Sequence, residues 1–521
     1  MTKVLITDIT GAATVPESIE TKVAVGSVWS LASVGVTLVA SLIATPFVLR
    51  GLGPEAYGVY AIVQVMIGYL AVADIGMGDA STRFAAAAFA RGERHEEASA
   101  LWTSLVIEAI VALPLVLVVG LFAKPIVVHA FRLPSYLENA AAAALAIAAL
   151  GFLAKNAATV FNTPQMVRLR FRSVAVINTV CGVLQIGLVP VVIWMGGGLV
   201  SAVVVIAAAN TLNLLLHLQQ ARVLLPEVTH PAPRRDLFRP MLRFGIALVV
   251  SAFVITLLTQ TEKLFLARFD SARAVAYYAV AYTLATIVAI IPRAVKGALF
   301  PAFSQLEGSA VDRLYARAVR SLSLVIAPVA VVMCLIAEPF LRIWAGAEYA
   351  RYSLWPFYVL LAGNAVGALA HVPTVLLKGL GRADVIARLQ ILEIVPFLVS
   401  AALFTRWWGA LGAAAAWSLR MILDTALLFR VASRYAHISI DTSPRERIGI
   451  ASAAALLGAP LLLLALPDPS IPVRVAVAVM TLIAYCAVAW RSLLTIGELS
   501  RLIEMAEALM WRRPANNRLG V

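Results

Sequence analysis

Long apolar runs follow one another along almost the whole chain, and they constrain the fold more than any other feature. A helix needs about 20 apolar residues to cross a hydrocarbon core about 30 Å thick. Fourteen runs meet this requirement, and the chain is therefore predicted to be an all-α polytopic membrane protein with 14 transmembrane helices. The runs lie near residues 23–49, 59–81, 98–121, 138–162, 173–195, 198–220, 244–267, 274–300, 318–341, 353–377, 384–405, 410–433, 448–466 and 472–490.

The composition supports the membrane class and argues against an enzyme. Only 13% of the 521 residues are charged, against about 25% in soluble domains. The three cysteines all fall inside apolar runs, which argues against a disulfide framework and a metal cluster. The sequence contains no Walker-type glycine-rich loop and no nucleophile elbow. We therefore expect no cofactor and no catalytic residues.

The positions of lysine and arginine predict the orientation of the chain. About 30 of the 42 lie in or beside every second connection, the side that the positive-inside rule assigns to the cytoplasm. This places both termini inside, with a tail over residues 1–22 and a linker over 221–243. The net charge of +14 is then a signal of topology and of anionic membrane lipids, not of nucleic-acid binding.

Two similar breaks stand in the two halves of the chain. "GLGPEAYGVYAIV" (Gly51 to Val63) separates the first two spans, and "FDSARAVAYYAVA" (Phe269 to Ala281) separates spans 7 and 8. Six spans separate the breaks, so both halves run the same way through the membrane. This pattern predicts a parallel repeat of two lobes, residues 23–220 and 244–433, with a transport path between them.

The first break and "LAVADIGMGDASTRFAAAAFARGE" (Leu70 to Glu93) resemble the first third of bacterial polysaccharide-unit flippases of the Wzx type. These flippases belong to the multidrug/oligosaccharidyl-lipid/polysaccharide exporter (MOP) superfamily. "TQTEKLFLARFDSARAVAYYAVAY" (Thr259 to Tyr282) is similar to the start of the second lobe in that family. The second break lacks the Gly-Pro of the first, so the two hinges need not bend alike.

The resemblance implies two six-helix lobes around a cavity that opens alternately to each side. It implies translocation of undecaprenyl-diphosphate-linked oligosaccharide across the bacterial inner membrane, with polysaccharide polymerase and chain-length machinery as partners. The spans within 448–490 would be the two additional helices common in the family. Beyond them, the alternation of charged and apolar residues over 493–513 predicts an amphipathic helix on the cytoplasmic membrane face.

Ionisable residues inside spans are candidates for function because a charge at membrane depth is costly. Gln260 and Lys263 share one face of span 7, where the amine is a candidate to bind a diphosphate. Glu262 occupies a position that is often acidic in the family and is a candidate coupling carboxylate. The structural alternative is a simple pairing of Glu262 with Lys263.

Further candidates lie toward the inner ends of the spans. Asp74 is predicted to close a cytoplasmic gate by pairing with Arg293 or Lys296, against the alternative of ordinary solvated loop charges. Arg83 and Arg293 at the inner mouth, with Lys296, are also candidates to bind the diphosphate. Gln64, on the stripe that carries Asp74, is a further candidate for substrate binding, and Glu393 in span 11 is one for coupling.

Three rival functions remain open. A drug or organic-cation antiporter of the same fold would need a mainly anionic or aromatic cavity, whereas the candidate residues are of mixed charge. The sequence does not distinguish a lipid II flippase from a polysaccharide-unit flippase. A polysaccharide polymerase or ligase usually has a sizeable outer loop, and the longest here, near residues 122–137, is short.

Overall fold

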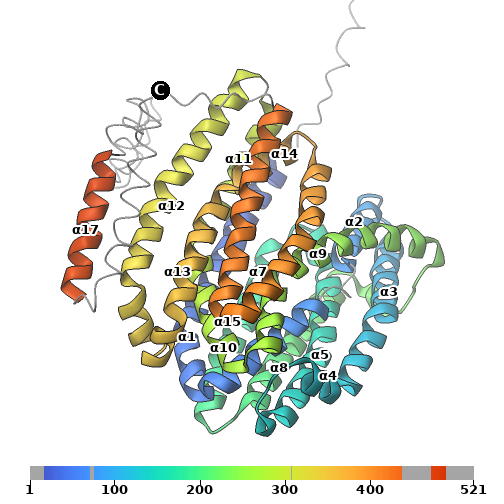
Figure 1. Ribbon diagram of the computed structural model, residues 1–521. Coiled ribbons are helices and arrows are strands. Elements are labelled where there is room, and N and C mark those ends of the chain that lie inside the picture. The colour runs from blue at the N-terminus through green and yellow to red at the C-terminus, as the bar shows by residue number, and fades with distance from the viewer. Residues whose placement is uncertain (1–16, 71–75, 307, 437–470, 489–521) are drawn as a thin grey trace, which may run out of the picture. The chain divides into compact units, whose positions relative to one another are not determined.

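The computed structural model describes residues 17–70, 76–306, 308–436 and 471–488 (Figure 1). These residues form helices joined by short connections, and the described part contains no β-strand. The first half holds α1 (Glu17–Leu70), α2 (Met77–Ala90), α3 (Arg94–Leu121), α4 (Ala123–Ala130), α5 (Ser135–Phe161), α6 (Thr163–Val167), α7 (Phe171–Trp194), α8 (Leu199–Leu224) and η2 (Pro226–Thr229). The second half holds α9 (Arg235–Phe269), α10 (Ala272–Ala285), η3 (Thr286–Ala289), α11 (Ile290–Gln305), α12 (Ser309–Trp344), α13 (Ala347–Leu369), α14 (His371–Gly379), α15 (Ala383–Ala436) and α17 (Ile471–Val488).

Two of the helices are too long for a single membrane crossing. α1 and α15 each have 54 residues, or about 80 Å at 1.5 Å per residue, against a hydrocarbon core of about 30 Å. Each contains one non-helical glycine, Gly53 with φ 73° and Gly409 with φ 54°. Glycine adopts positive φ without a steric penalty. Each long helix is therefore two spans joined at a sharp kink.

The helices match the predicted spans. Ten stretches of the described residues are long and apolar enough to cross a membrane. They overlap the first twelve predicted spans, because two of the stretches are the kinked helices and each overlaps two spans. α17 overlaps the last predicted span. The predicted span 448–466 and the predicted amphipathic helix 493–513 lie outside the described residues, as does most of the tail 1–22. The chain is an all-α polytopic membrane protein, as predicted.

Three boundaries differ from the prediction. The predicted span 59–81 is not one regular helix, because Gly76, directly before α2, has φ 57°. The predicted span 274–300 contains the 3-10 turn η3 between α10 and α11. The predicted linker 221–243 is mostly helical, since α8 extends to Leu224, η2 follows, and α9 begins at Arg235.

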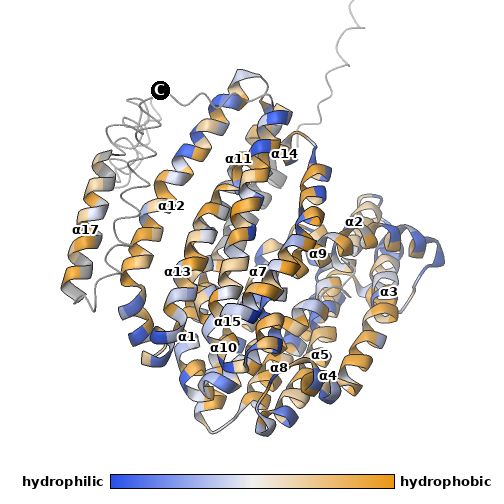
Figure 2. Ribbon diagram, viewed as in Figure 1, coloured by the Kyte–Doolittle hydropathy of each residue, from blue (hydrophilic) through white to orange (hydrophobic). Residues whose placement is uncertain are grey.

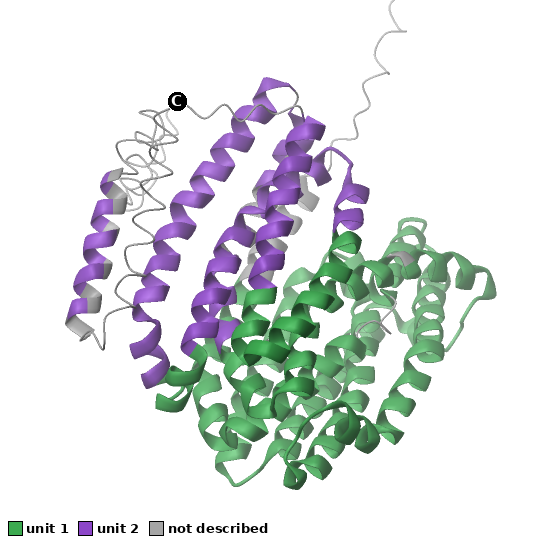
Figure 3. Cartoon of the chain, viewed as in Figure 1, with its two compact units in different colours: residues 1–280, 344–353, 390–416 green, residues 281–343, 354–389, 417–521 purple. Residues whose placement is uncertain are grey.

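The chain divides into two compact units (Figure 3). Unit 1 contains Met1–Val280, Trp344–Ser353 and Gln390–Ala416. One of its apolar clusters joins α2, α3, α8 and the start of α9 around Met77, Leu101 and Met241. A second joins α1, α7 and α8, and a third packs α9 against α15. Unit 1 thus contains the first half of the chain together with short segments from the second half.

Unit 2 contains Ala281–Ile343, Leu354–Leu389 and Trp417–Val521. Within it α11 packs against α14. α13 lies close to α15, because a Cβ at Gly363 would lie 2.6 Å from the Ser418 Cα. The Ser418 hydroxyl donates to the Val359 carbonyl at 2.7 Å, which fixes the same contact.

Large apolar side chains cover the outer surfaces of several helices. Figure 2 shows α3 hydrophobic along most of its length, with hydrophilic residues gathered at one end. On this helix Ile110 is 58% exposed and Leu117 is 52% exposed. Such extended apolar surface is unfavourable in water and is typical of helices that face lipid.

Candidate functional site

The candidate residues of α9 form a buried polar cluster. Lys263 Nζ donates to Gln260 Oε1 at 2.7 Å and lies 3.9 Å from Glu262 Oε1. Tyr278, on α10, donates its hydroxyl to Glu262 Oε1 at 3.3 Å. Glu262 is fully buried and Lys263 is 7% exposed. The structure therefore brings the three predicted residues together and contains the Glu262–Lys263 pairing.

The other candidates are distributed over several helices. Gln64 Nε2 donates to the Tyr60 hydroxyl within α1, 3.2 Å away. One residue before Glu262 on α9, the Thr261 hydroxyl is hydrogen-bonded to the Tyr69 hydroxyl of α1. The polar face of the second half of α1 is thus next to the Lys263 cluster.

Arg83 and Glu393 occupy contrasting environments. Arg83 is exposed on α2, and its guanidinium carbon lies 4.7 Å from the centre of the Phe244 ring at the start of α9. Glu393 is 7% exposed on α15, next to Ile394, which packs against the apolar cluster between α9 and α15. Asp74 and the side chains of Arg293 and Lys296 lie outside the described residues, so their gate stays a prediction.

A contact that the sequence analysis missed joins the two hinge segments within unit 1. Arg273 Nη2 donates to Glu55 Oε1 at 2.8 Å, and Tyr136 at the start of α5 also donates its hydroxyl to Glu55. The helices approach closely here, because a Cβ at Gly58 would lie 1.7 Å from the Ala272 carbonyl oxygen. The sequence did carry a signal, since the first break contains a carboxylate and the second a guanidinium.

Segments that were predicted on the same side of the membrane meet in unit 1. A hollow of about 440 Å³ is lined from four such connections, by Gly51–Ala56, Tyr136, Leu137, Ala140, Gly198, Leu199 and Arg273. All four were predicted on the outside. The prediction that successive connections alternate between the two sides of the membrane therefore agrees with the observed packing.

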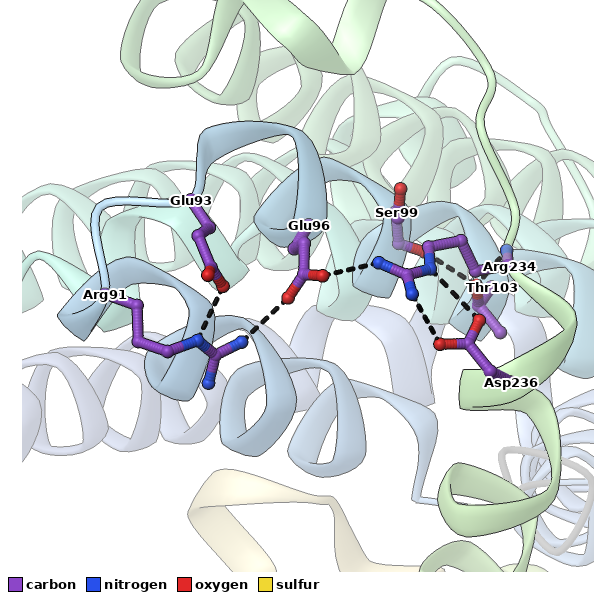
Figure 4. A network of polar contacts seen from close by, with 7 residues as sticks. All are labelled: Arg91, Glu93, Glu96, Ser99, Thr103, Arg234 and Asp236. Atoms are coloured by element: carbon purple, nitrogen blue, oxygen red, sulfur yellow. Dashed lines mark hydrogen bonds and ion pairs between the residues drawn. The ribbon is translucent and has the colours of Figure 1, made fainter.

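Two connections that were predicted inside also meet, through an ion-pair network (Figure 4). Arg91 bonds Glu93 and Glu96, and Glu96 in turn accepts from Arg234, which also bonds Asp236. Hydrogen bonds to Asp236 and Glu96 raise the pKa of Arg234. Hydrogen bonds to Glu93 and Glu96 likewise raise the pKa of Arg91. Both guanidiniums therefore remain charged, and they fasten the segment before α9 to the α2–α3 connection.

The segment before α9 is held by neutral contacts as well. The backbone N–H of Arg234 donates to Thr103 Oγ1 at 3.0 Å, and Trp102 Nε1 donates to the Val228 carbonyl at 3.1 Å. Val228 is buried in the cluster around Met241. The predicted linker is therefore packed against α3. Among the described residues no group of three or more His, Cys, Asp or Glu side chains is placed to hold a metal ion.

The fold is shared with solved membrane transporters. A lipid II flippase, MurJ, in an inward closed conformation has a TM-score of 0.62 at 11% identity, over 90% of this chain and 99% of that one. An inward-facing multidrug resistance MATE family transporter of the MOP superfamily has a TM-score of 0.60 at 16% identity, over 77% and 94%. The bent form of the Vibrio cholerae MATE transporter VcmN has a TM-score of 0.54 at 16% identity, over 80% and 97%. The fold is that of multi-pass transporters of the MOP superfamily.

The sequence comparison is more specific. The family model described as "Polysaccharide biosynthesis protein" matches residues 23–307, more than half of the chain. This protein belongs to that family. The "Putative O-antigen transporter" of Shigella flexneri is 25% identical over 409 residues, which cover 77% of this chain and 96% of the relative.

Proposed function

We propose that this protein moves undecaprenyl-diphosphate-linked oligosaccharide units from the inner to the outer leaflet of the bacterial cytoplasmic membrane. The observation that carries the proposal is the similarity to the Shigella flexneri relative over almost its whole length, together with the family match. A lipid-linked oligosaccharide is the form in which an O-antigen unit would meet a membrane transporter. The oligosaccharide needs a polar path, whereas the prenyl chain can stay in lipid.

The proposed orientation follows from charge. The side with the Arg91–Glu96–Arg234 network carries most of the basic connections and is assigned to the cytoplasm, with both termini. The side with the Glu55–Arg273 pair is assigned to the outside. In this orientation the Glu55–Arg273–Tyr136 contact is a closure of the outer face, which has to open when the sugar leaves.

The proposed binding of the lipid head uses Lys263. A diphosphate in a low-dielectric site needs a compensating cation, and Lys263 is a buried amine that donates to Gln260 and lies near Glu262. If a phosphate oxygen replaced Gln260 Oε1 as the acceptor, the Lys263 amine would still have a hydrogen-bond partner. The carboxylates Glu262 and Glu393 remain candidates for ion coupling, and the exposed Arg83 a candidate for first contact with the diphosphate at the inner mouth.

The remaining parts of the proposal concern domain organisation and gating. We retain two alike lobes, residues 23–220 and 244–433, related by a parallel repeat. Asp74 with Arg293 or Lys296 remains the proposed cytoplasmic gate. Charge reversal at Asp74 and at one of the two cations should together restore export that either change alone removes, and a double variant as inactive as the single ones would exclude the pair.

Deletion and complementation test the function directly. Removal of the gene should abolish surface polysaccharide and cause lipid-linked units to accumulate on the inner leaflet, and a plasmid copy should restore export. Expression in a strain depleted of its lipid II flippase is the second arm. Rescue of that strain, with normal surface polysaccharide after deletion, would show that the substrate is lipid II and would overturn the proposal.

A further inference from the structure

Unit 1 contains a cavity of about 600 Å³ at the start of α10 and the start of α13. It is lined by Arg273, Tyr277, Ala347, Glu348, Arg351 and Tyr352. Its size falls within the range of about 300–1,000 Å³ that is usual for small-molecule sites. Only Arg273 has a part in the closure described above, so the other polar groups of the cavity have no role in that mechanism.

The walls of the cavity are fixed by contacts among their own side chains. Tyr277 donates its hydroxyl to Glu348 Oε1 at 2.5 Å. Its ring stacks on Tyr352, with centroids 5.0 Å apart and planes 19° apart. It also meets the Tyr349 ring edge to face, with centroids 5.5 Å apart. A ligand would therefore meet a preformed surface and would lose little binding energy to ordering it.

The charges of the lining favour an anion. Two guanidiniums, Arg273 and Arg351, stand against one carboxylate, Glu348. Arg273 uses Nη2 for Glu55, but its side chain is 51% exposed, so other N–H groups remain accessible. Arg351 is exposed, with its guanidinium carbon 5.5 Å from the Tyr352 ring centre. A guanidinium fork matches the two oxygens of a carboxylate.

The other groups favour a ligand that is rich in hydroxyls. A carboxylate has two oxygens with about four lone-pair sites, so Glu348 can accept from a ligand while it accepts from Tyr277. Tyr352 is 48% exposed and offers an aromatic surface to an apolar C–H face. A diphosphate would offer no hydroxyl donor to Glu348. A pyranose with a carboxylate satisfies all of these groups.

We propose that this cavity binds a carboxylated sugar of the transported oligosaccharide. Arg351 and Arg273 bind the sugar carboxylate, Glu348 accepts its hydroxyls, and Tyr352 packs against the ring. The proposal rests on the transport function proposed above and deepens it, because it specifies an acidic sugar. In the proposed orientation the cavity lies on the outer side, where it would receive the sugar before release.

Binding is measured with the purified full-length protein in nanodiscs by calorimetric titration. The probes are a hyaluronan tetrasaccharide, which contains glucuronate, and 3′-sialyllactose. Chitotetraose and lactose are the neutral counterparts, and inorganic pyrophosphate is the second anion. At least one acidic probe should bind tenfold or more tighter than its neutral counterpart, and Arg351→Gln and Tyr352→Ala should each weaken that binding fivefold or more.

Arg342→Gln is the matched control, because Arg342 is an exposed arginine at the end of α12 that pairs with Glu338 and does not line the cavity. Arg342→Gln should leave the binding of the sugars unchanged. Melting temperatures equal to that of the wild type should show that all three variants are folded. Equal binding of acidic and neutral sugars, binding of neither acidic probe, or binding unaffected by Arg351→Gln overturns the proposal. Tight pyrophosphate binding that displaces the acidic sugars would instead identify a site for the lipid head.

Failure of this proposal and failure of the transport function give different results. If complementation does not restore surface polysaccharide, the transport function fails whatever the cavity binds. If complementation succeeds but the acidic probes do not bind, only the sugar site is wrong. Arg351→Gln should also lower export severalfold in the complemented strain, whereas Arg342→Gln should not.

Discussion

Arg273 donates to Glu55 at 2.8 Å, so residues that lie 218 positions apart in the chain are ion-paired at the two hinge segments. Tyr136 donates to the same carboxylate, so α1, α5 and α10 meet at one side chain. The side chains of the pair are 51% and 30% exposed. Exposed pairs contribute little to stability, and a weak closure is what a transporter needs, because the closure has to open in every cycle.

Charge reversal at one member of this pair should reduce export, and reversal at both should restore part of it. Glu55→Arg and Arg273→Glu each place like charges together, and we expect each to lower export about two- to fivefold, the range that a weak pair allows. The double variant restores the attraction and should export better than either single variant in a complementation assay, although it lacks the cation that Arg273 supplies to the cavity. Lys124→Glu alters an exposed cation on α4 and should have no effect. A double variant no better than either single one would show that the contact is not a closure.

A side chain at Gly58 should disrupt the packing of α1 against α10. A Cβ there would lie 1.7 Å from the Ala272 carbonyl oxygen, and backbone cannot yield as a flexible side chain does. Gly58→Ala should therefore destabilise the protein near the upper end of the about 1–3 kcal/mol seen for overpacking. Gly68→Ala lies on the same helix with no atom within 4 Å and should melt like the wild type in detergent. Equal melting temperatures for the two variants would contradict the close approach.

The helices could be predicted because the length of an apolar run and the position of basic residues are local properties of the sequence. The Gly51–Pro54 cluster likewise marked the kink of α1. Gly409, which bends α15 in the same way, lies in the short connection predicted between spans 384–405 and 410–433, although no proline marks it. The break at Gly76 was missed because apolar residues lie on both sides of it, so the run has no visible end there.

Arg168 and Glu97 form a buried ion pair that should be a large contributor to stability. Arg168 Nη2 donates to Glu97 Oε2 at 3.0 Å, a second bond joins Nη1 to Oε1, and Glu97 is fully buried. Arg168→Met leaves a buried carboxylate without its cation and should cost about 3–5 kcal/mol. Glu97→Met with Arg168→Met should recover most of the loss, as measured by thermal unfolding in detergent. A double variant less stable than Arg168→Met would contradict this.

The site could be predicted only in part, because contact between distant segments is not a local property. Gln260 and Lys263 were found because helical spacing places them on one face, and Glu262 because its position is often acidic in the family that the sequence resembles. Glu97 and Arg168 lie in two different connections between predicted spans, and only tertiary packing brings them together and buries them. For Glu55 and Arg273 the charges were visible, but no spacing rule relates positions in two different hinges.

The amine of Lys263 should be required for export without being required for folding. Lys263→Gln removes the cation proposed to bind the diphosphate, and we expect export to fall at least tenfold. In Lys263→Gln alone, the buried Glu262 carboxylate loses its counter-charge. The double variant Lys263→Gln/Glu262→Gln removes this carboxylate as well, so it should fold stably yet remain inactive. Lys155→Gln, an exposed lysine on α5, is the matched control and should export normally. Normal export by the double variant at wild-type protein levels would show that Lys263 and Glu262 are only a structural pair.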